Sequence, residues 1–188
     1  MATFRVLDVY TVFPVASEEC YDTVVWVANE ENAQSISVDP RKIVIAGDSA
    51  GGYLAATASI LAKQRGLAAI NGQALIYPIT DLKFDTDSYK EFANGYDLTP
   101  EAMEWFWDHY LPDKAARTNI LASPLQASTK DLEGLPRALV ITAEADILRD
   151  KAEAYARKLL AAGNDIVATR YLGIIHGIQT HGRLLRIL

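Results

Sequence analysis

Residues 42–52 read Lys-Ile-Val-Ile-Ala-Gly-Asp-Ser-Ala-Gly-Gly and decide the fold of this 188-residue chain. The apolar run Lys42–Ala46 is typical of a buried β-strand. The Ala- and Leu-rich stretch Ala50–Arg65 predicts a helix, and Gly66 is suited to end it in a left-handed conformation. The chain therefore passes from a strand into a helix through a short turn that contains one serine.

The turn has the pattern Gly-x-Ser-x-Gly, which in a strand–turn–helix context raises a serine hydroxyl above the sheet edge, at the N-terminus of a helix. We predict that Ser49 is a catalytic nucleophile, with Gly47, Asp48, Gly51 and Gly52 forming the elbow around it. Glycine is expected two residues on either side of the serine because a side chain there would be too crowded. The alternatives are a glycine turn that only joins strand to helix, and a phosphate-binding loop, which would require a lysine that this motif lacks.

Strands and helices alternate along the rest of the chain. Ser17, followed by two glutamates, is predicted to be the N-cap of a helix over Ser17–Asn29. Further strands are predicted at Phe4–Val9, Gln73–Tyr77, Ala138–Ala143 and Ile166–Tyr171, and a further helix at Lys151–Ala162. The pattern predicts one α/β domain over residues 1–188, a three-layer sandwich with helices on both faces of a mostly parallel sheet.

Residues 82–118 interrupt this alternation and carry 8 of the 17 aromatic residues. That much aromatic area requires an apolar surface against which to pack. A partial helical cap over a pocket and plain packing of two helices onto the sheet both fit this composition.

Composition excludes several classes of function. The net charge is −6, so the clustered Lys and Arg of nucleic-acid binding are lacking. Cys20 is the single cysteine, which excludes an internal disulfide and a cysteine-based zinc site, and we assign it no chemistry. No apolar stretch reaches the length of a membrane span and the first residues do not resemble a secretory signal, so we expect a cytoplasmic protein.

A serine nucleophile needs a base to accept its proton and an acid to orient that base. The three histidines are His109, His176 and His181. His176 follows the last predicted strand and precedes a glycine, so its ring can reach over the strand ends, and we favour it as the base. His109 belongs to the aromatic segment and His181 to the end of the chain.

The acid is expected between the serine and the histidine in sequence. Asp146 follows the strand Ala138–Ala143, and the 30 residues between Asp146 and His176 fit one helix, one strand and two short loops. The alternatives are Glu144, which is close to the strand end, and Asp150, which suits the start of a helix. Asp146 could itself be a helix cap.

Six segments together resemble the hormone-sensitive-lipase branch of the α/β-hydrolase carboxylesterases, also called bacterial family IV. They are Gly-Asp-Ser-Ala-Gly-Gly (47–52), Tyr-Pro-Ile-Thr-Asp (77–81), Asn-Gly-Tyr-Asp-Leu-Thr (94–99), Ala-Ser-Pro-Leu (122–125), the stretch from Leu-Pro-Arg to Leu-Arg-Asp (135–150) and Ile-His-Gly (175–177). The resemblance implies hydrolysis of short- to medium-chain acyl esters, a helical cap and no cofactor. It implies Ser49 as nucleophile, His176 as base, Asp146 as orienting acid and the Ala50 N–H as an oxyanion donor.

The chain departs from that family at both ends. The family's His-Gly-Gly-Gly stretch, whose N–H groups complete the oxyanion hole, is missing before Gly47, and only Ile178–Leu188 follows the last motif. We therefore expect a truncated family member. Because one lost oxyanion donor typically costs about 10²–10³ in turnover, a ligand-binding module with little or no activity is the alternative function. An open sheet edge, such as the strand near 166–171, would favour a homo-oligomer.

Overall fold

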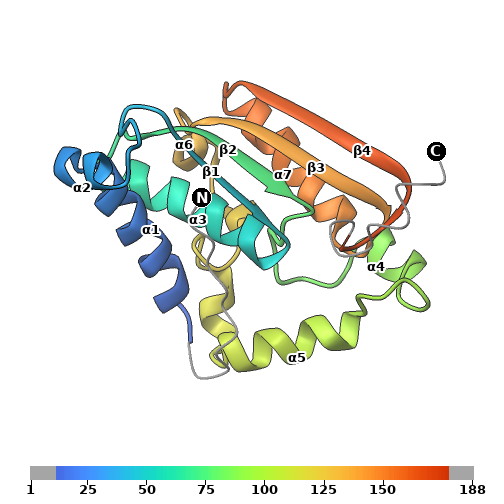
Figure 1. Cartoon of the computed structure of the whole chain (residues 1–188). Coiled ribbons are helices and arrows are strands. Elements are labelled where there is room, and N and C mark those ends of the chain that lie inside the picture. The colour runs from blue at the N-terminus through green and yellow to red at the C-terminus, as the bar shows by residue number, and fades with distance from the viewer. Residues whose placement is uncertain (1–11, 178–188) are drawn as a thin grey trace.

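The computed structural model describes residues 12–177, which form an α/β structure around one four-stranded sheet (Figure 1). The strands are β1 (Ile43–Asp48), β2 (Ile70–Ile76), β3 (Arg137–Ala145) and β4 (Ile166–Ile175). They lie in the order β1-β2-β3-β4 and every neighbouring pair is parallel, which confirms the predicted α/β class. The predicted strand Phe4–Val9 lies outside the described residues.

Residues 12–177 also contain seven α-helices and two short 3₁₀ helices, of which the first two precede β1 and the others lie between the strands. The helices are α1 (Val15–Ala28), α2 (Glu30–Ser35), α3 (Ala50–Gln64), α4 (Asp87–Glu91), α5 (Pro100–Tyr110), η1 (Lys114–Thr118), η2 (Pro124–Gln126), α6 (Thr129–Leu132) and α7 (Arg149–Ala161). The helix after the serine ends as predicted, because Gly66 has a φ of +71°. Helix α3 follows β1 and leads to β2, and helix α7 follows β3 and leads to β4.

The expected helical cover is present on only one face of the described sheet. Helix α3 packs on β1 and β2, α7 packs on β3 and β4, and α1 packs against α3. The strands follow one another in a single direction across the sheet, and right-handed crossovers in one direction all fall on the same face. Helices on both faces would require a reversal of strand order, which residues 12–177 do not contain.

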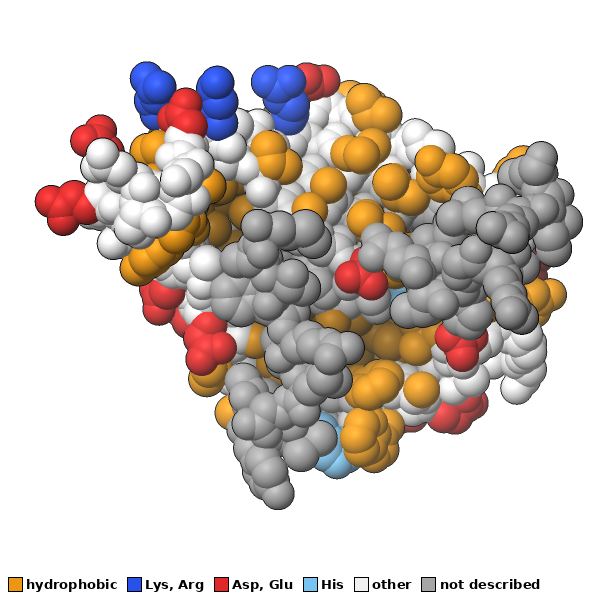
Figure 2. Space-filling view, viewed as in Figure 1, with side chains coloured by type: hydrophobic (Ala, Val, Ile, Leu, Met, Phe, Trp, Pro, Cys, Tyr) orange, Lys and Arg blue, Asp and Glu red, His pale blue; other side chains and the backbone are white. Residues whose placement is uncertain are grey.

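The opposite face of the sheet is apolar and open. Alternation along β3 buries Ala138 and Val140 under the helices, whereas Leu139 points to the other side and is 38% exposed. Val167 of β4 is in register with Leu139 and is 59% exposed. Val44 of β1 lies on the same face of the sheet and is 65% exposed. Figure 2 shows hydrophobic side chains across this face of the sheet.

The aromatic segment packs at the end of the sheet that carries the strand carboxyl termini (Figure 1). Tyr89, Phe92 and Trp107 are buried in one apolar cluster with Tyr53 from α3 and Ile147 after β3. The solvent side of α5 exposes Trp105 and Phe106, so only part of the aromatic area finds an apolar partner. Because α4 and α5 contact both the serine-bearing helix and the residues after β3, the segment borders the site described below.

The first helix begins earlier than predicted, and Ser17 is not its N-cap. Helix α1 starts at Val15, so Ser17 lies inside the first turn and is fully buried. Its hydroxyl donates to the Tyr53 hydroxyl (3.4 Å) and accepts from the Thr57 hydroxyl (3.3 Å). A buried contact with α3 therefore takes the side chain that the sequence pattern assigned to capping.

Candidate active site

Ser49 occupies a strained turn between β1 and α3. Its φ is +53°, a conformation that non-glycine residues adopt rarely and that is often found at functional sites. The Ser49 N–H donates to the Ile76 carbonyl at the end of β2 (2.9 Å), which fixes the turn against the neighbouring strand. The side chain is half-buried and lies at the carboxyl end of the parallel strands.

Two glycines of the turn are required by close backbone contacts, and one is not. A Cβ at Gly47 would lie 2.3 Å from the carbonyl carbon and oxygen of Gly51, and a Cβ at Gly52 would lie 2.9 Å from the Pro78 Cβ. A Cβ at Gly51 would meet nothing closer than the Asp48 carboxylate at 3.9 Å. The expectation of crowding on both sides of the serine was therefore wrong for Gly51, and Gly52 is the crowded position instead.

His176 follows the end of β4 and contacts Ser49. Its Nε2 lies 2.9 Å from the Ser49 Oγ, and the residue is only 8% exposed. The ring of Tyr77, which follows β2, packs against the imidazole with 4.7 Å between ring centroids. Tyr77 was expected only to end a strand. Its position at the same sheet edge as Ser49 could have indicated that its side chain lies near the site.

Asp146 holds the other side of the imidazole. Its Oδ2 lies 2.8 Å from the His176 Nδ1, and its Oδ1 accepts from the Leu148 N–H at 2.9 Å. The carboxylate is 1% exposed, so both oxygens are occupied in a nearly dry environment. Asp146 is not the N-cap of α7, which is Leu148. Its Oδ1 closes the turn before that helix while its Oδ2 contacts the histidine.

The residues considered as alternatives to Asp146 and His176 have other hydrogen-bond partners or lie outside the described residues. The Glu144 carboxylate accepts from the Gly173 N–H, and the Asp150 carboxylate accepts from the Ser88 N–H. His109 lies on the exposed side of α5, with its Nδ1 2.7 Å from the Trp105 carbonyl. His181 lies outside the described residues.

The N-terminus of α3 offers a hydrogen-bond donor beside the serine. Ala50 is the first residue of α3, and the first N–H groups of a helix have no acceptor within that helix. Ala50 is therefore the donor that the turn itself presents.

Tyr89 lies close enough to Asp146 to feel its charge, and like Tyr77 it was given no role from the sequence. Burial, with additional contributions from the charges of Asp146 and Asp81, raises the pKa of its phenol, so the hydroxyl stays protonated. The hydroxyl has no hydrogen-bond partner among the described residues.

Burial also raises the pKa of the Cys20 thiol to about 11, which keeps it protonated and a poor nucleophile.

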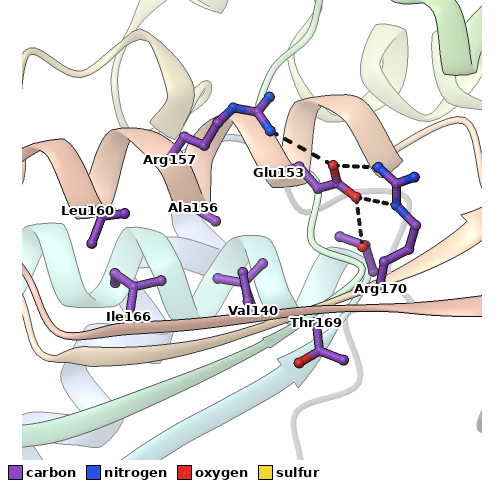
Figure 3. A pocket seen from close by; sticks show the side chains of 10 residues that line it. Val140, Glu153, Ala156, Arg157, Leu160, Ile166, Thr169 and Arg170 are labelled. Atoms are coloured by element: carbon purple, nitrogen blue, oxygen red, sulfur yellow. Dashed lines mark hydrogen bonds and ion pairs between the residues drawn. The ribbon is translucent and has the colours of Figure 1, made fainter.

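A separate groove of about 380 Å³ lies between α7 and β4 (Figure 3). Glu153 stands at its polar end and accepts two 2.7 Å hydrogen bonds from Arg170. The Arg170 guanidinium holds the pKa of the Glu153 carboxyl below its ordinary value. Arg157 lies 3.8 Å from the same carboxylate, so the polar end holds two guanidinium groups and one carboxylate. The rest of the groove presents aliphatic side chains such as Leu160 and Ile166.

Among residues 12–177, no group of three or more His, Cys, Asp or Glu side chains could hold a metal ion. No helix in that range is long and apolar enough to cross a membrane.

The site combines a serine on the turn between β1 and α3, an aspartate after β3 and a histidine after β4. This arrangement, in the chain order Ser–Asp–His, defines the class of α/β hydrolases. The model of a family described as "alpha/beta hydrolase fold" matches residues 10–180, so the chain belongs to this family.

Several relatives of the chain are named as esterases or ester hydrolases. It is 36% identical over 174 residues to an ethyl acetate hydrolase of Pseudomonas putida, covering 92% of this chain and 54% of the relative. It is 36% identical over 175 residues to an arylesterase of Saccharolobus solfataricus, covering 93% and 56%. A fungal esterase structure from Rhizomucor miehei superposes with a TM-score of 0.88 at 66% identity, covering 89% of this chain and 52% of that one. The chain spans about half the length of these relatives.

Proposed function

We propose that this chain carries the catalytic triad of a serine carboxylesterase, with Ser49 as nucleophile, His176 as general base and Asp146 as the acid that orients it. The observation that carries the proposal is the continuous hydrogen-bonded series from the Ser49 Oγ through the imidazole to the Asp146 carboxylate. Esterase activity in the relatives and the hormone-sensitive-lipase motifs support an ester as substrate.

In the first half of the reaction, the Ser49 Oγ attacks the ester carbonyl carbon while its proton passes to the His176 Nε2. The carbonyl oxygen becomes an oxyanion beside the Ala50 N–H, at the positive end of the α3 dipole. As the tetrahedral intermediate collapses, the imidazolium gives its proton to the leaving alcohol. The acyl group is then bonded to Ser49.

In the second half, water attacks the acyl-enzyme and His176 takes its proton. Collapse of the second intermediate returns that proton to the Ser49 Oγ and releases the carboxylic acid. Asp146 accepts a hydrogen bond from the Nδ1–H in both halves, so the lone pair of Nε2 faces the reacting oxygen and the imidazolium is stabilised.

We further propose that residues 82–118 form one wall of the acyl site, because α4 and α5 pack against both α3 and the residues after β3. Esters with short to medium acyl chains, which the resemblance to the hormone-sensitive-lipase branch implies, are the substrates we propose for this site. The edge strand β4 is the surface through which a second copy of the chain would pair. The edge of β4 opposite β3 has no partner strand among residues 12–177.

The competing function is a ligand-binding module with little turnover. The observation on its side is that Ala50, the first residue of α3, is the oxyanion donor that the described turn presents. The proposal is tested by hydrolysis of p-nitrophenyl esters of increasing acyl length, with Ser49→Ala as the matched control. Turnover that Ser49→Ala abolishes supports the esterase; a folded chain with no turnover above Ser49→Ala supports the binding module.

A further inference from the structure

Strand β4 is irregular just before the histidine. Ala143 of β3 pairs with Tyr171 of β4, but Ala145 pairs with Ile175, so β3 advances two residues while β4 advances four. Gly173 lies within this bulge and has a φ of +69°. Bulges bend a strand and redirect the side chains that follow, and His176 is the first residue after β4.

One hydrogen bond joins this bulge to the strand that carries the acid. The Glu144 Oε2 accepts from the Gly173 N–H at 2.6 Å. Glu144 lies two residues before Asp146, and Gly173 lies three residues before His176. The Arg149 guanidinium donates to the Glu144 carbonyl at 2.9 Å, which ties the backbone of the same residue to the start of α7.

We propose that Glu144 is a positioning residue for His176: its carboxylate holds the β4 bulge through the Gly173 N–H and so keeps the imidazole between Ser49 and Asp146. The proposal rests on the proposed function, because positioning affects a rate only if His176 transfers the proton. It assigns a role to a carboxylate that sequence analysis weighed only as an alternative acid.

The geometry explains why the bulge needs this support. Gly173 is exposed, and apart from its chain neighbours no atom of the described residues lies within 4 Å of the place where its Cβ would stand, so side-chain packing within residues 12–177 does not restrain it there. Proton transfer over a 2.9 Å Nε2–Oγ distance is sensitive to displacements of about 1 Å, which can cost up to about 10²-fold in rate. A single charge-assisted hydrogen bond at the base of the loop is well placed to limit such displacements.

The test compares Glu144→Ala with Glu144→Gln, whose amide oxygen can still accept the Gly173 N–H. Glu31→Ala removes an exposed carboxylate on α2 and serves as the matched control. The rate at which a fluorophosphonate probe labels Ser49 is measured against probe concentration and against pH.

We expect Glu144→Ala to lower the limiting labelling rate by about 10-fold or more, without changing the half-saturating probe concentration or the midpoint of the pH profile. Glu144→Gln and Glu31→Ala should stay within about threefold of the parent. Equal losses in Glu144→Ala and Glu144→Gln, or a shifted pH midpoint in both, would show that charge acts rather than the hydrogen bond, and would overturn the proposal. So would a Glu144→Ala rate equal to that of the parent.

A second measurement does not depend on activity. In NMR spectra of the parent, the Gly173 amide should exchange slowly and the proton shared by the His176 Nδ1 and Asp146 should give a resolved signal. Glu144→Ala should lose both features and Glu144→Gln should keep both. If both signals persist in Glu144→Ala, the positioning role is refuted, whereas failure of the parent to label while these signals respond as expected refutes the proposed function alone.

Discussion

Replacing Asp146 by asparagine should abolish most of the activity without disturbing the fold. The two oxygens of Asp146 have separate partners, the Leu148 N–H at 2.9 Å and the His176 Nδ1 at 2.8 Å. Asparagine has the same shape, and its amide oxygen can still accept from Leu148. Its NH₂ group then faces Nδ1, so the ring is favoured in the tautomer that places a proton on Nε2, where the lone pair must accept the proton of Ser49.

The expected loss follows from this wrong tautomer. In an established serine-hydrolase triad the same exchange of acid for amide costs about 10⁴ in turnover, so we expect a decrease of about 10³–10⁴ here, equivalent to about 4–5.5 kcal/mol of transition-state stabilisation. The unfolding free energy should change far less, because the side-chain volume and the bond to Leu148 are retained.

The assay is p-nitrophenyl acetate hydrolysis, with circular dichroism to establish folding. Asp150→Asn is the matched control, because that carboxylate accepts from the Ser88 N–H and should change the rate by no more than about threefold. The reasoning is refuted if Asp146→Asn keeps more than about one tenth of the activity, or if Asp150→Asn is the more damaging substitution.

Four other substitutions test separate parts of the molecule. His109→Ala should leave ester turnover within about threefold, because the ring is exposed on α5; a loss as large as that of a triad residue, measured in the same assay, would contradict this. Gly47→Ala should destabilise the fold by about 3 kcal/mol or more in urea titrations, because its Cβ would lie 2.3 Å from backbone atoms of Gly51, whereas Gly51→Ala should change stability by less than about 1 kcal/mol. The Arg170 guanidinium lowers the pKa of the Glu153 carboxyl in the folded chain. The ion pair therefore stabilises the fold at pH values above the ordinary pKa of a glutamate. This stabilisation is lost as the pH falls through the lowered pKa of Glu153. Arg170→Met should therefore cost about 0.5–1 kcal/mol at neutral pH and progressively less in acid; a cost that is constant with pH would count against the ion pair.

The sequence predicted the strands and the turn because these depend on local pattern. Strand β1 and helix α3 lie within two residues of the predicted bounds, and apolar runs located the centres of the other described strands. Proximity of Ser49, Asp146 and His176 also followed from sequence, since carboxyl ends of parallel strands meet at one edge.

Features that depend on strand order or tertiary contact were not predictable in the same way. The helices cover only one face of the described sheet because the strands lie in the order β1-β2-β3-β4, and no single segment of the sequence encodes that order. Ser17 has the surroundings of an N-cap, yet it is buried against Tyr53, and only the packing of α1 on α3 determines that. The contact between Glu144 and Gly173 requires a bulge in β4 whose register is set by the pairing with β3.

Mass spectrometry of the fluorophosphonate-treated chain tests the central claim most directly. Trypsin releases Ser49 in the peptide spanning residues 43–63, which also contains Thr57 and Ser59. Both of those hydroxyls are buried and donate to helix carbonyls, so fragmentation should place the adduct on Ser49 alone, and His176→Ala should greatly slow its formation. An adduct on another residue, or a labelling rate unaffected by His176→Ala in a folded chain, would contradict the account.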